Sequence, residues 1–333
     1  MTRIGIIGGG AWGTALACVT RRAGAQAILW AREAEVVEAI NAGRGNPIFL
    51  PNIKLESGIT ATTDIVGAVD GIDAVLLVAP AQHLRAVISD MASHLAPNTP
   101  IVICTKGIEQ GSCALMSEVV AEVLPGLPIA VLSGPTFAAE VVNDLPTAVT
   151  LATEDGGLGE QLVAAIGTPR FRPYISKDPV GAQIGGAVKN VLAIACGIVA
   201  GRRLGDNARA ALITRGIAEI ARLGMAKGAM PETLMGLSGL GDLTLTCTGE
   251  QSRNMSLGQA LGDGRKLEEI LSERTSVTEG VFTAAAVRAL AEKLGIEMPI
   301  CNAVDDVINR RHDLDDVIAG LLARPFSSEG HTK

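Results

Sequence analysis

One lysine lies in the middle of the most apolar stretch of the sequence. Between residues 180 and 201 the only strongly polar residues are Gln183, Lys189 and Asn190, and this Lys-Asn pair argues for a buried helix rather than a membrane span. Burial of an ammonium group is costly and lowers a lysine pKa toward neutrality. A lysine in that state can take a proton from a substrate hydroxyl and return it in the reverse reaction. We therefore interpret Lys189 as a catalytic acid/base; the alternative is a lysine whose stem lies on apolar surface while its ammonium reaches water.

Three glycines near the start of the chain have the spacing of a dinucleotide-binding loop. Gly8, Gly10 and Gly13 follow an apolar run at residues 3–7 and open a stretch with helical periodicity. Gly8 permits a tight turn, Gly10 lets the backbone approach a pyrophosphate, and Gly13 lets helix and strand pack closely. The first N–H groups of the helix then favour phosphate. An ordinary glycine-rich turn is the alternative, but the position between strand and helix favours an NAD or NADP site.

The residues after the next apolar run bear on the choice between these two cofactors. Arg32 and Glu33 follow residues 26–30, where the adenosine ribose lies in such sites. A guanidinium there can bind a 2′-phosphate with two hydrogen bonds. Glu33 either binds a free 2′-hydroxyl or begins the next helix. The sequence therefore predicts NADP or NAD, with NADP favoured.

Two further apolar runs end in residues suited to binding an anion. Lys106 follows residues 101–104, and Gly134 and Thr136 follow residues 129–132. In open α/β sheets the ligand crevice lies outside the carboxyl ends of the parallel strands. We therefore expect Lys106 to bind an anion there, with backbone and hydroxyl contacts from Gly134 and Thr136. A solvated loop lysine and ordinary turn residues are the alternatives.

A second polar cluster follows in the last third of the chain. Residues 237–242 are expected to form a glycine-rich turn that presents the carboxylate of Asp242. Ser252, Arg253 and Asn254 then open a predicted helix, where N–H groups, a hydroxyl and a guanidinium together suit a phosphate monoester. The alternative is a helix N-cap followed by a surface arginine.

Composition excludes several other classes of protein. The 333 residues carry 28 basic and 35 acidic side chains, a net charge of −7, and only 2% are aromatic, which argues against a nucleic-acid partner. The six cysteines form no CxxC pair, which is typical of reduced cytoplasmic thiols. The histidines lack the spacing of metal ligands, so we predict no metal site. We interpret Asp305, Asp306 and residues 313–316 as a solvated acidic face.

The order of apolar runs predicts an α/β fold. Strand-like runs alternate with helical stretches up to about residue 177, which favours βαβ units and a doubly wound, mostly parallel sheet. Beyond that point only helical spacing recurs. We expect a nucleotide-binding domain at residues 1–178, an all-helical substrate domain at residues 179–326 and a flexible tail at residues 327–333. The strands are expected at residues 3–7, 26–30, 73–78, 100–104, 128–132, 147–152 and 171–174.

With these residues placed, the chain closely resembles the bacterial-type NAD(P)+-dependent glycerol-3-phosphate dehydrogenases. The resemblance runs from Ile4 to about Ala323 and includes specific motifs in the family's order and spacing. They are the glycine loop with its following WGTAL at residues 12–16, CTKGIE at residues 104–109, LSGPTFA at 132–138, IGGAVKNV at 184–191, NARAALITRG at 207–216, and the segment from GLGDL at 239–243 to SRN at 252–254.

The resemblance implies an N-terminal Rossmann domain, a helical domain that carries much of the substrate site, and Lys189 as the proton acceptor. The residues that it places around the substrate are Lys106, Gly134, Thr136, Lys189, Asp242, Ser252, Arg253 and Asn254. Those that it places around the cofactor are Gly8, Gly10, Ala11, Trp12, Gly13, Arg32, Glu33, Phe49, Lys106, Ala138, Arg253, Val277 and Glu279. Ala11 and Phe49 depart from the commonest family form, which has serine and tyrosine or histidine there. Neither therefore supplies a polar side-chain contact to the cofactor.

The implied reaction is reversible hydride transfer between the nicotinamide C4 and C2 of sn-glycerol 3-phosphate or dihydroxyacetone phosphate. The family's usual direction is reduction, which supplies glycerol 3-phosphate for phospholipid synthesis. We expect a cytoplasmic homodimer with a small phosphate substrate, no nucleic-acid partner and no stable membrane insertion. One alternative is a related dehydrogenase of another hydroxy acid or sugar acid phosphate. The other is a dinucleotide-binding sensor, which would lack Lys189 or the cluster around Asp242 and Arg253.

Overall fold

An eight-stranded sheet occupies the first half of the chain in the computed structural model, which describes residues 1–274 and 278–325. Neighbouring strands are parallel, except that β6 and β7 run antiparallel. In order across the sheet the strands are β3 (Ile59–Thr62), β2 (Gln26–Trp30), β1 (Arg3–Ile7), β4 (Ala74–Leu77), β5 (Ile101–Ile103), β6 (Ile129–Ser133), β7 (Thr147–Ala152) and β8 (Phe171–Ser176). The predicted mostly parallel sheet is confirmed.

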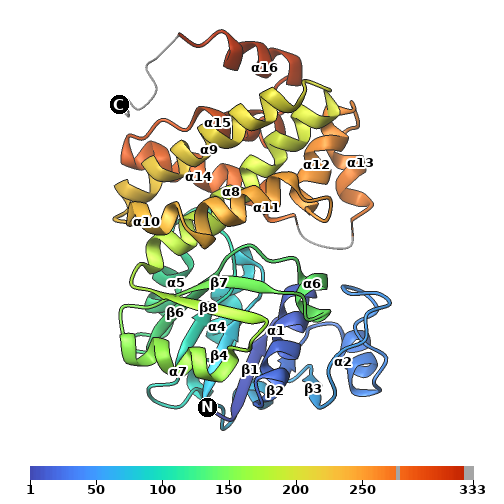
Figure 1. Cartoon of the computed structure of the whole chain (residues 1–333), viewed down its shortest axis with the longest axis vertical. Coiled ribbons are helices and arrows are strands. Elements are labelled where there is room, and N and C mark those ends of the chain that lie inside the picture. Colours follow the sequence, from blue (N-terminus) through green and yellow to red (C-terminus); the bar gives the residue numbers. More distant parts are fainter. Residues whose placement is uncertain (275–277, 326–333) are drawn as a thin grey trace.

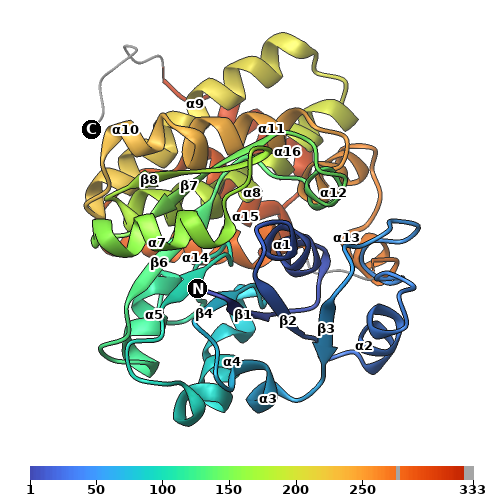
Figure 2. The ribbon, with the colours of Figure 1, turned by 60° about the horizontal axis from the view of Figure 1, so that its bottom comes forward.

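Helices cover both faces of this sheet, and Figure 2 shows α1 on one side of β1 and β2 with α3 and α4 on the other. Successive strand residues point to opposite faces, so Leu76 belongs to one buried apolar cluster and Leu77 to the other. The helices of the first face are α1 (Ala11–Arg22), α2 (Ala34–Asn41), α6 (Ala138–Val142) and α7 (Gly156–Ile166); those of the second are α3 (Ile65–Val69), α4 (Leu84–Met91) and α5 (Met116–Val123), with short 3₁₀ turns η1 (Ala81–His83) and η2 (Ala92–His94) beside α4. The doubly wound arrangement is also confirmed.

The second half of the described chain is helical and packs around one long helix, α8 (Pro179–Gly201), as Figure 1 shows. Asp178 caps the start of α8 by accepting the N–H of Gly181 at 2.7 Å. The helices around it are α9 (Asp206–Ala226), α10 (Pro231–Leu234), the π-helical turn η3 (Leu237–Gly241), α11 (Asp242–Thr248), α12 (Arg253–Gly262), α13 (Leu267–Ser272), α14 (Glu279–Leu294), α15 (Pro299–Ile308) and α16 (Leu314–Leu322). This half is the helical region that the sequence predicts.

By length and apolar composition α8 could cross a membrane, and it alone among the described helices meets both criteria. However, 89% of its apolar window is buried inside the protein. Its glycines let neighbouring backbones come close: a Cβ on Gly197 would lie 2.0 Å from the carbonyl oxygen of Met255 in α12. These contacts are typical of a core helix.

Several elements and one interpretation of the sequence need correction. The sequence did not predict β3, and the expected turn at residues 237–242 is the π-helical turn η3, which leads directly into α11. The solvated acidic face is wrong for Asp305, which is buried, with its carboxylate 3.5 Å from Arg288 Nη1 and 3.2 Å from Arg310 Nε. The tail predicted at residues 327–333 lies outside the described residues.

Candidate active site

The glycine loop joins β1 to α1 in the geometry that its spacing predicts. Gly8 has a φ of +133°, which favours glycine, and a Cβ there would lie 2.8 Å from the carbonyl carbon of Val78. A Cβ on Gly13 would lie 1.8 Å from the carbonyl oxygen of Gly8, so α1 packs directly against the turn that follows β1. A Cβ on Gly10 would instead meet nothing within 4 Å. The start of α1 therefore opens onto free space.

That space is the central cavity, of about 440 Å³, between the sheet and the helical half. Its lining residues come from both halves of the chain: Gly8, Gly9, Gly10, Ala11, Trp12, Gly13, Trp30, Arg32, Glu33, Phe49, Val78, Ala79, Pro80, His83, Val87, Cys104, Thr105, Lys106, Thr136, Phe137, Ala138, Lys189, Asn190, Arg253, Asn254 and Glu279. The structure thus brings together most of the site residues named from the sequence. Gly134, Asp242 and Ser252 lie outside this lining. Gly134 and Asp242 bond to the lining residue Lys106, and Ser252 directly precedes the lining residue Arg253. Val277 lies outside the described residues.

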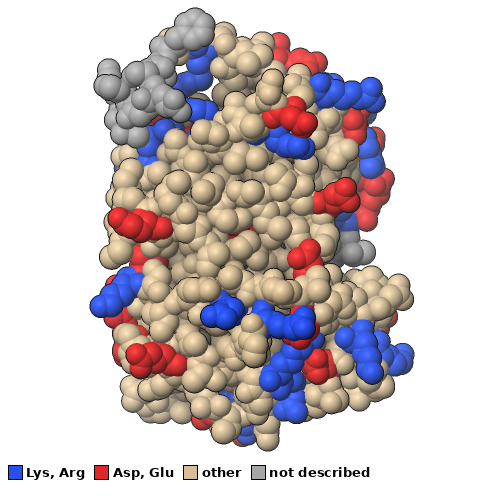
Figure 3. Space-filling model, in the orientation of Figure 1, with Lys and Arg blue, Asp and Glu red and all other residues tan. Residues whose placement is uncertain are grey.

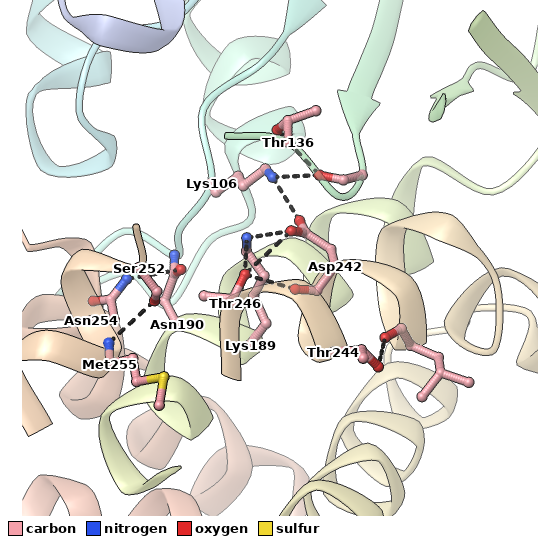
Figure 4. A network of polar contacts seen from close by, with 12 residues as sticks. Lys106, Thr136, Lys189, Asn190, Asp242, Thr244, Thr246, Ser252, Asn254 and Met255 are labelled. Atoms are coloured by element: carbon pink, nitrogen blue, oxygen red, sulfur yellow. Dashed lines mark hydrogen bonds and ion pairs between the residues drawn. The ribbon is translucent and has the colours of Figure 1, made fainter. Parts of the chain in front are cut away.

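Two lysines meet one carboxylate at the inner end of the cavity (Figure 4). Lys189 Nζ lies 2.5 Å from Asp242 Oδ1, and Lys106 Nζ lies 2.6 Å from Asp242 Oδ2. Lys106 also donates to the carbonyl oxygen of Gly134 at 3.0 Å. Asp242 is fully buried and Lys189 is 6% exposed. Since unpaired buried charges are costly, these groups hold one another in place.

Thr246 is a second hydrogen-bond acceptor for the Lys189 ammonium. Its Oγ1 donates to the backbone carbonyl of Asp242 at 2.7 Å, which leaves its lone pairs free to accept from Lys189 Nζ at 2.8 Å. Two of the three donor directions of the Lys189 ammonium are therefore occupied by protein, and the third is left for the cavity that Lys189 lines. Sequence reasoning missed Thr246, although its position one helical turn after Asp242 places both on one face of α11.

Burial makes Lys189 easier to deprotonate. Desolvation lowers the pKa of this ammonium to about 8, and the nearby charge of Lys106 acts in the same direction, while the carboxylate of Asp242 opposes both. A group with that pKa can both accept and donate a proton near neutral pH. The pKa shift expected from the apolar sequence around Lys189 therefore has its cause in this structure.

Close backbone packing explains why Asp242 meets Lys189, 53 residues earlier in the chain. A Cβ on Gly185 of α8 would lie 2.5 Å from the carbonyl oxygen of Ser238 in η3. The glycine therefore lets η3 lie directly against α8. Lys189 lies one helical turn after Gly185 in α8. Because η3 leads directly into α11, Asp242, the first residue of α11, lies beside Lys189.

The residues at the start of α12 divide between helix capping and the cavity. Ser252 Oγ accepts the N–H of Met255 at 3.2 Å, so Ser252 is the N-cap that the alternative interpretation described. Asn254 Nδ2 donates to Asn190 Oδ1 at 3.0 Å, and the Arg253 side chain lines the cavity. Sequence reasoning gave Asn190 no role, although it follows Lys189 directly.

The outer rim of the cavity carries Arg32 and Glu33. The Arg32 side chain is 81% exposed, and its Nη2 lies 3.0 Å from Glu33 Oε1. Both residues line the cavity beyond the end of β2. The structure therefore places an exposed guanidinium at the rim, held by an adjacent carboxylate.

The open side of the glycine loop and the unpaired polar atoms of the cavity are compatible with a dinucleotide. The open side of Gly10 leaves room for a pyrophosphate at the start of α1. Two buried lining atoms, Trp12 Nε1 and Glu279 Oε2, have no hydrogen-bond partner among the described residues. Burial raises the pKa of Glu279 to about 7. These atoms are suited to the polar edges of a ligand.

Comparison with known proteins gives the family. The model for the N-terminus of NAD-dependent glycerol-3-phosphate dehydrogenases matches residues 3–158, and the model for their C-terminus matches residues 178–319. The chain belongs to this family. Its resemblance to the family, drawn from the motifs, is confirmed.

Individual members agree along nearly the whole chain. A glycerol-3-phosphate dehydrogenase [NAD(P)+] of Rhodospirillum rubrum is 61% identical, over 98% of this chain and 94% of the relative. One of Caulobacter vibrioides is 57% identical, over 98% of each. The crystal structure of glycerol-3-phosphate dehydrogenase from Coxiella burnetii matches with a TM-score of 0.93 and 41% identity. The match covers 97% of this chain and 99% of the Coxiella burnetii chain. These comparisons support the fold described above.

Proposed function

We propose that the chain catalyses reversible hydride transfer between NAD(P) and the C2 carbon of sn-glycerol 3-phosphate or dihydroxyacetone phosphate. The observation that carries this proposal is a buried lysine of lowered pKa, held by Asp242 and Thr246 at the inner end of a cavity that opens onto the glycine loop. Membership of the family and the names of its closely similar members support the same reaction.

Lys189 acts as the general base and general acid in this reaction. The nicotinamide, when bound, supplies or takes up the hydride. During oxidation, neutral Lys189 takes the proton of the C2 hydroxyl; during reduction, charged Lys189 donates a hydrogen bond and then a proton to the ketone oxygen. Asp242 and Thr246 keep Nζ directed at that oxygen. Asp242 also stabilises the charged form.

We propose that the substrate phosphate binds among the polar groups that border Lys189. Arg253 supplies charge-assisted hydrogen bonds, and Lys106 supplies a second positive charge. The remaining substrate contacts in this proposal are Gly134, Thr136, Asp242, Ser252 and Asn254. The Ser252 hydroxyl hydrogen remains available while its oxygen caps α12.

We propose the rest of the cavity as the cofactor site, with NADP favoured over NAD. The pyrophosphate lies at the glycine loop, and Arg32 binds the 2′-phosphate at the rim in competition with its ion pair to Glu33. Residues 1–178 then act as the cofactor domain and residues 179–326 as the substrate domain. The other proposed cofactor contacts are Ala11, Trp12, Phe49, Lys106, Ala138, Arg253, Val277 and Glu279.

We further propose a cytoplasmic homodimer that supplies glycerol 3-phosphate for phospholipid synthesis, without stable insertion into a membrane. Large apolar side chains of β8 and the α10 region, Tyr174, Ile175, Met230 and Met235, are 45–56% exposed. Figure 3 shows a broad area with few charged side chains over this face. Such a patch supports association with a second copy. Sedimentation of the purified protein tests the oligomer directly.

Initial-rate assays test the proposed reaction. We expect NADPH or NADH to reduce dihydroxyacetone phosphate, with a much lower rate for unphosphorylated dihydroxyacetone and for 2-keto acids. Equal or faster turnover of a 2-keto acid would instead support a related hydroxy-acid dehydrogenase. Tight NADPH binding without turnover of any ketone would support a dinucleotide sensor.

A further inference from the structure

A buried amide, Asn46, lies directly behind the glycine loop. Its side chain is outside the cavity lining, and the residue is 1% exposed. Its Nδ2 donates to the carbonyl oxygen of Gly9 at 2.9 Å and to Thr14 Oγ1 at 2.8 Å. Its Oδ1 accepts the N–H of Phe49 at 3.1 Å. Because the Gly9 carbonyl can only accept and the Phe49 N–H can only donate, these partners fix which end of the amide faces the loop.

The bond to Gly9 also determines the direction of the Gly9–Gly10 peptide. Its carbonyl points away from the cavity toward Asn46, and in a trans peptide the N–H points the opposite way. Gly10 is the N-cap residue of α1 and lines the cavity on its open side. The Gly10 N–H is therefore turned toward the space where the pyrophosphate fits. A flipped peptide would present a carbonyl oxygen to the phosphate oxygens instead.

We propose that Asn46 is a positioning residue for the pyrophosphate, acting through the Gly9–Gly10 peptide without touching the cofactor. Glycines permit the loop geometry, but they also make it easy to reverse a peptide, since both φ signs are open to them. The Asn46 amide supplies the missing restraint by stabilising one of the two peptide orientations. This inference rests on the proposed dinucleotide site.

The Asn46 amide also positions Phe49, which lines the cavity. The segment at residues 46–50 forms a tight loop in which the Leu50 N–H donates to the Asn46 carbonyl at 3.0 Å. The hydrogen bond from the Phe49 N–H to Asn46 Oδ1 therefore connects the loop at residues 46–50 to the glycine loop. The two functions of the side chain use different atoms: Nδ2 donates to the Gly9–Gly10 peptide, and Oδ1 accepts the N–H of Phe49.

The variant Asn46→Asp separates these two functions. It keeps an oxygen for the Phe49 N–H, removes both donors, and places an oxygen against the Gly9 carbonyl, so that the flipped peptide becomes the better partner. Asn41→Asp is the control, because Asn41 Nδ2 likewise donates to a backbone carbonyl, that of Ala61, at 2.9 Å but away from the cavity. If Asn46→Asp does not fold, Asn46→Ala is measured in its place, since it also removes the donor to Gly9.

Binding, rather than activity, is the decisive measurement. Dissociation constants of ADP, adenosine 2′-phosphate, NADPH and NADH are measured by calorimetry or nicotinamide fluorescence. We expect Asn46→Asp to weaken the binding of ADP, NADPH and NADH by about tenfold to hundredfold, with the same factor for both dinucleotides, because the Gly10 N–H is no longer held toward the pyrophosphate. Adenosine 2′-phosphate lacks a pyrophosphate, so its affinity should stay within about twofold. The kcat at saturating cofactor should change little compared with the KM for the cofactor.

Three outcomes would overturn the proposal. A folded Asn46→Asp or Asn46→Ala protein that binds ADP as tightly as the wild type would show that Asn46 serves the fold alone. Equal weakening of ADP and adenosine 2′-phosphate by Asn46→Asp would place the effect at the adenosine. Equal losses in Asn41→Asp would show a general effect of altering this region. Failure of the wild-type protein to bind any of the four ligands would instead count against the proposed function itself.

Discussion

The two ends of the central cavity are held by different kinds of contact. At the inner end, the side chains of Lys189 and Lys106 are 7% and 16% exposed, and both bind a carboxylate that is fully buried. At the rim, Arg32 is 81% exposed and pairs with its sequence neighbour Glu33. Buried charges interact strongly, whereas water and salt weaken interactions at an exposed rim. The effects of substitutions should therefore decrease from the inner end of the cavity to its rim.

Asp242→Asn should have the largest effect, because it leaves the buried ammonium of Lys189 and the partly buried ammonium of Lys106 without a compensating charge. We expect kcat to fall by about 10²–10⁴, the usual value of a positioned acid/base. Removing one partner of a buried ion pair typically costs about 3–5 kcal/mol of stability, so the melting temperature should fall as well. Steady-state kinetics and thermal unfolding measure the two. Near-normal kcat in a folded variant would contradict the proposed setting of Lys189.

Arg253→Ala should lower kcat/KM for dihydroxyacetone phosphate by about tenfold to hundredfold through lost charge-assisted hydrogen bonds. Unphosphorylated dihydroxyacetone cannot use them, so its already low kcat/KM should change little. Arg209→Ala, which removes a surface arginine paired with Asp206 on α9, is the control. Similar kcat/KM values for the two ketones in the wild type would refute the phosphate site.

Thr246→Val should lower kcat by about tenfold and leave both KM values nearly unchanged, because it removes one hydrogen bond from Lys189 to an uncharged hydroxyl and keeps the side-chain shape. Thr248→Val is the matched control: its hydroxyl also donates to the carbonyl four residues earlier in α11, at 2.7 Å, but bonds to no lysine among the described residues. If both variants lost the same activity, Thr246 would have only a structural role.

Arg32→Ala should have an effect that is restricted to one cofactor and does not reach the chemical step. We expect NADPH to bind about tenfold more weakly at low salt, and NADH to be affected little, since only NADPH carries the 2′-phosphate. Glu33→Gln should shift the preference slightly further toward NADPH by removing a like charge. Fluorescence titration at fixed ionic strength measures both. Equal losses for the two cofactors would show that Arg32 does not bind the 2′-phosphate.

The difference between the two ends also explains what the sequence could predict. The glycine loop and the apolar strands are local patterns, so the sheet and the dinucleotide cavity could be predicted directly. β3 was missed because it is an edge strand of only four residues, too short for its alternating pattern to stand out. Lys189 and Asp242 were each identified from their own surroundings, but their pairing across 53 residues depends on how Gly185 lets η3 approach α8.

The remaining residues that the sequence analysis misinterpreted or missed are buried polar groups whose partners lie elsewhere in the fold. Asp305 is buried and pairs with Arg310, five residues later, and with Arg288 in the preceding helix, a pairing that the acidic pattern of the sequence did not show. Thr246 and Asn46 have ordinary residue types, and their importance arises from partners on other elements or loops. Local patterns therefore predict which elements form, while the partners of buried polar groups require the structure.

The pH dependence of glycerol 3-phosphate oxidation tests the central claim most directly. Since the pKa of Lys189 is lowered to about 8 in the free enzyme, its neutral, proton-accepting form increases with pH, and kcat/KM should rise to a plateau with a midpoint near that value. Lys189→Ala should lose about 10²–10⁴ in kcat and this pH dependence, while NADPH affinity stays within a few-fold. Lys177→Ala, which removes an exposed lysine before α8, should behave as the wild type. More than a tenth of wild-type kcat in folded Lys189→Ala, with the pH profile unchanged, would contradict the account.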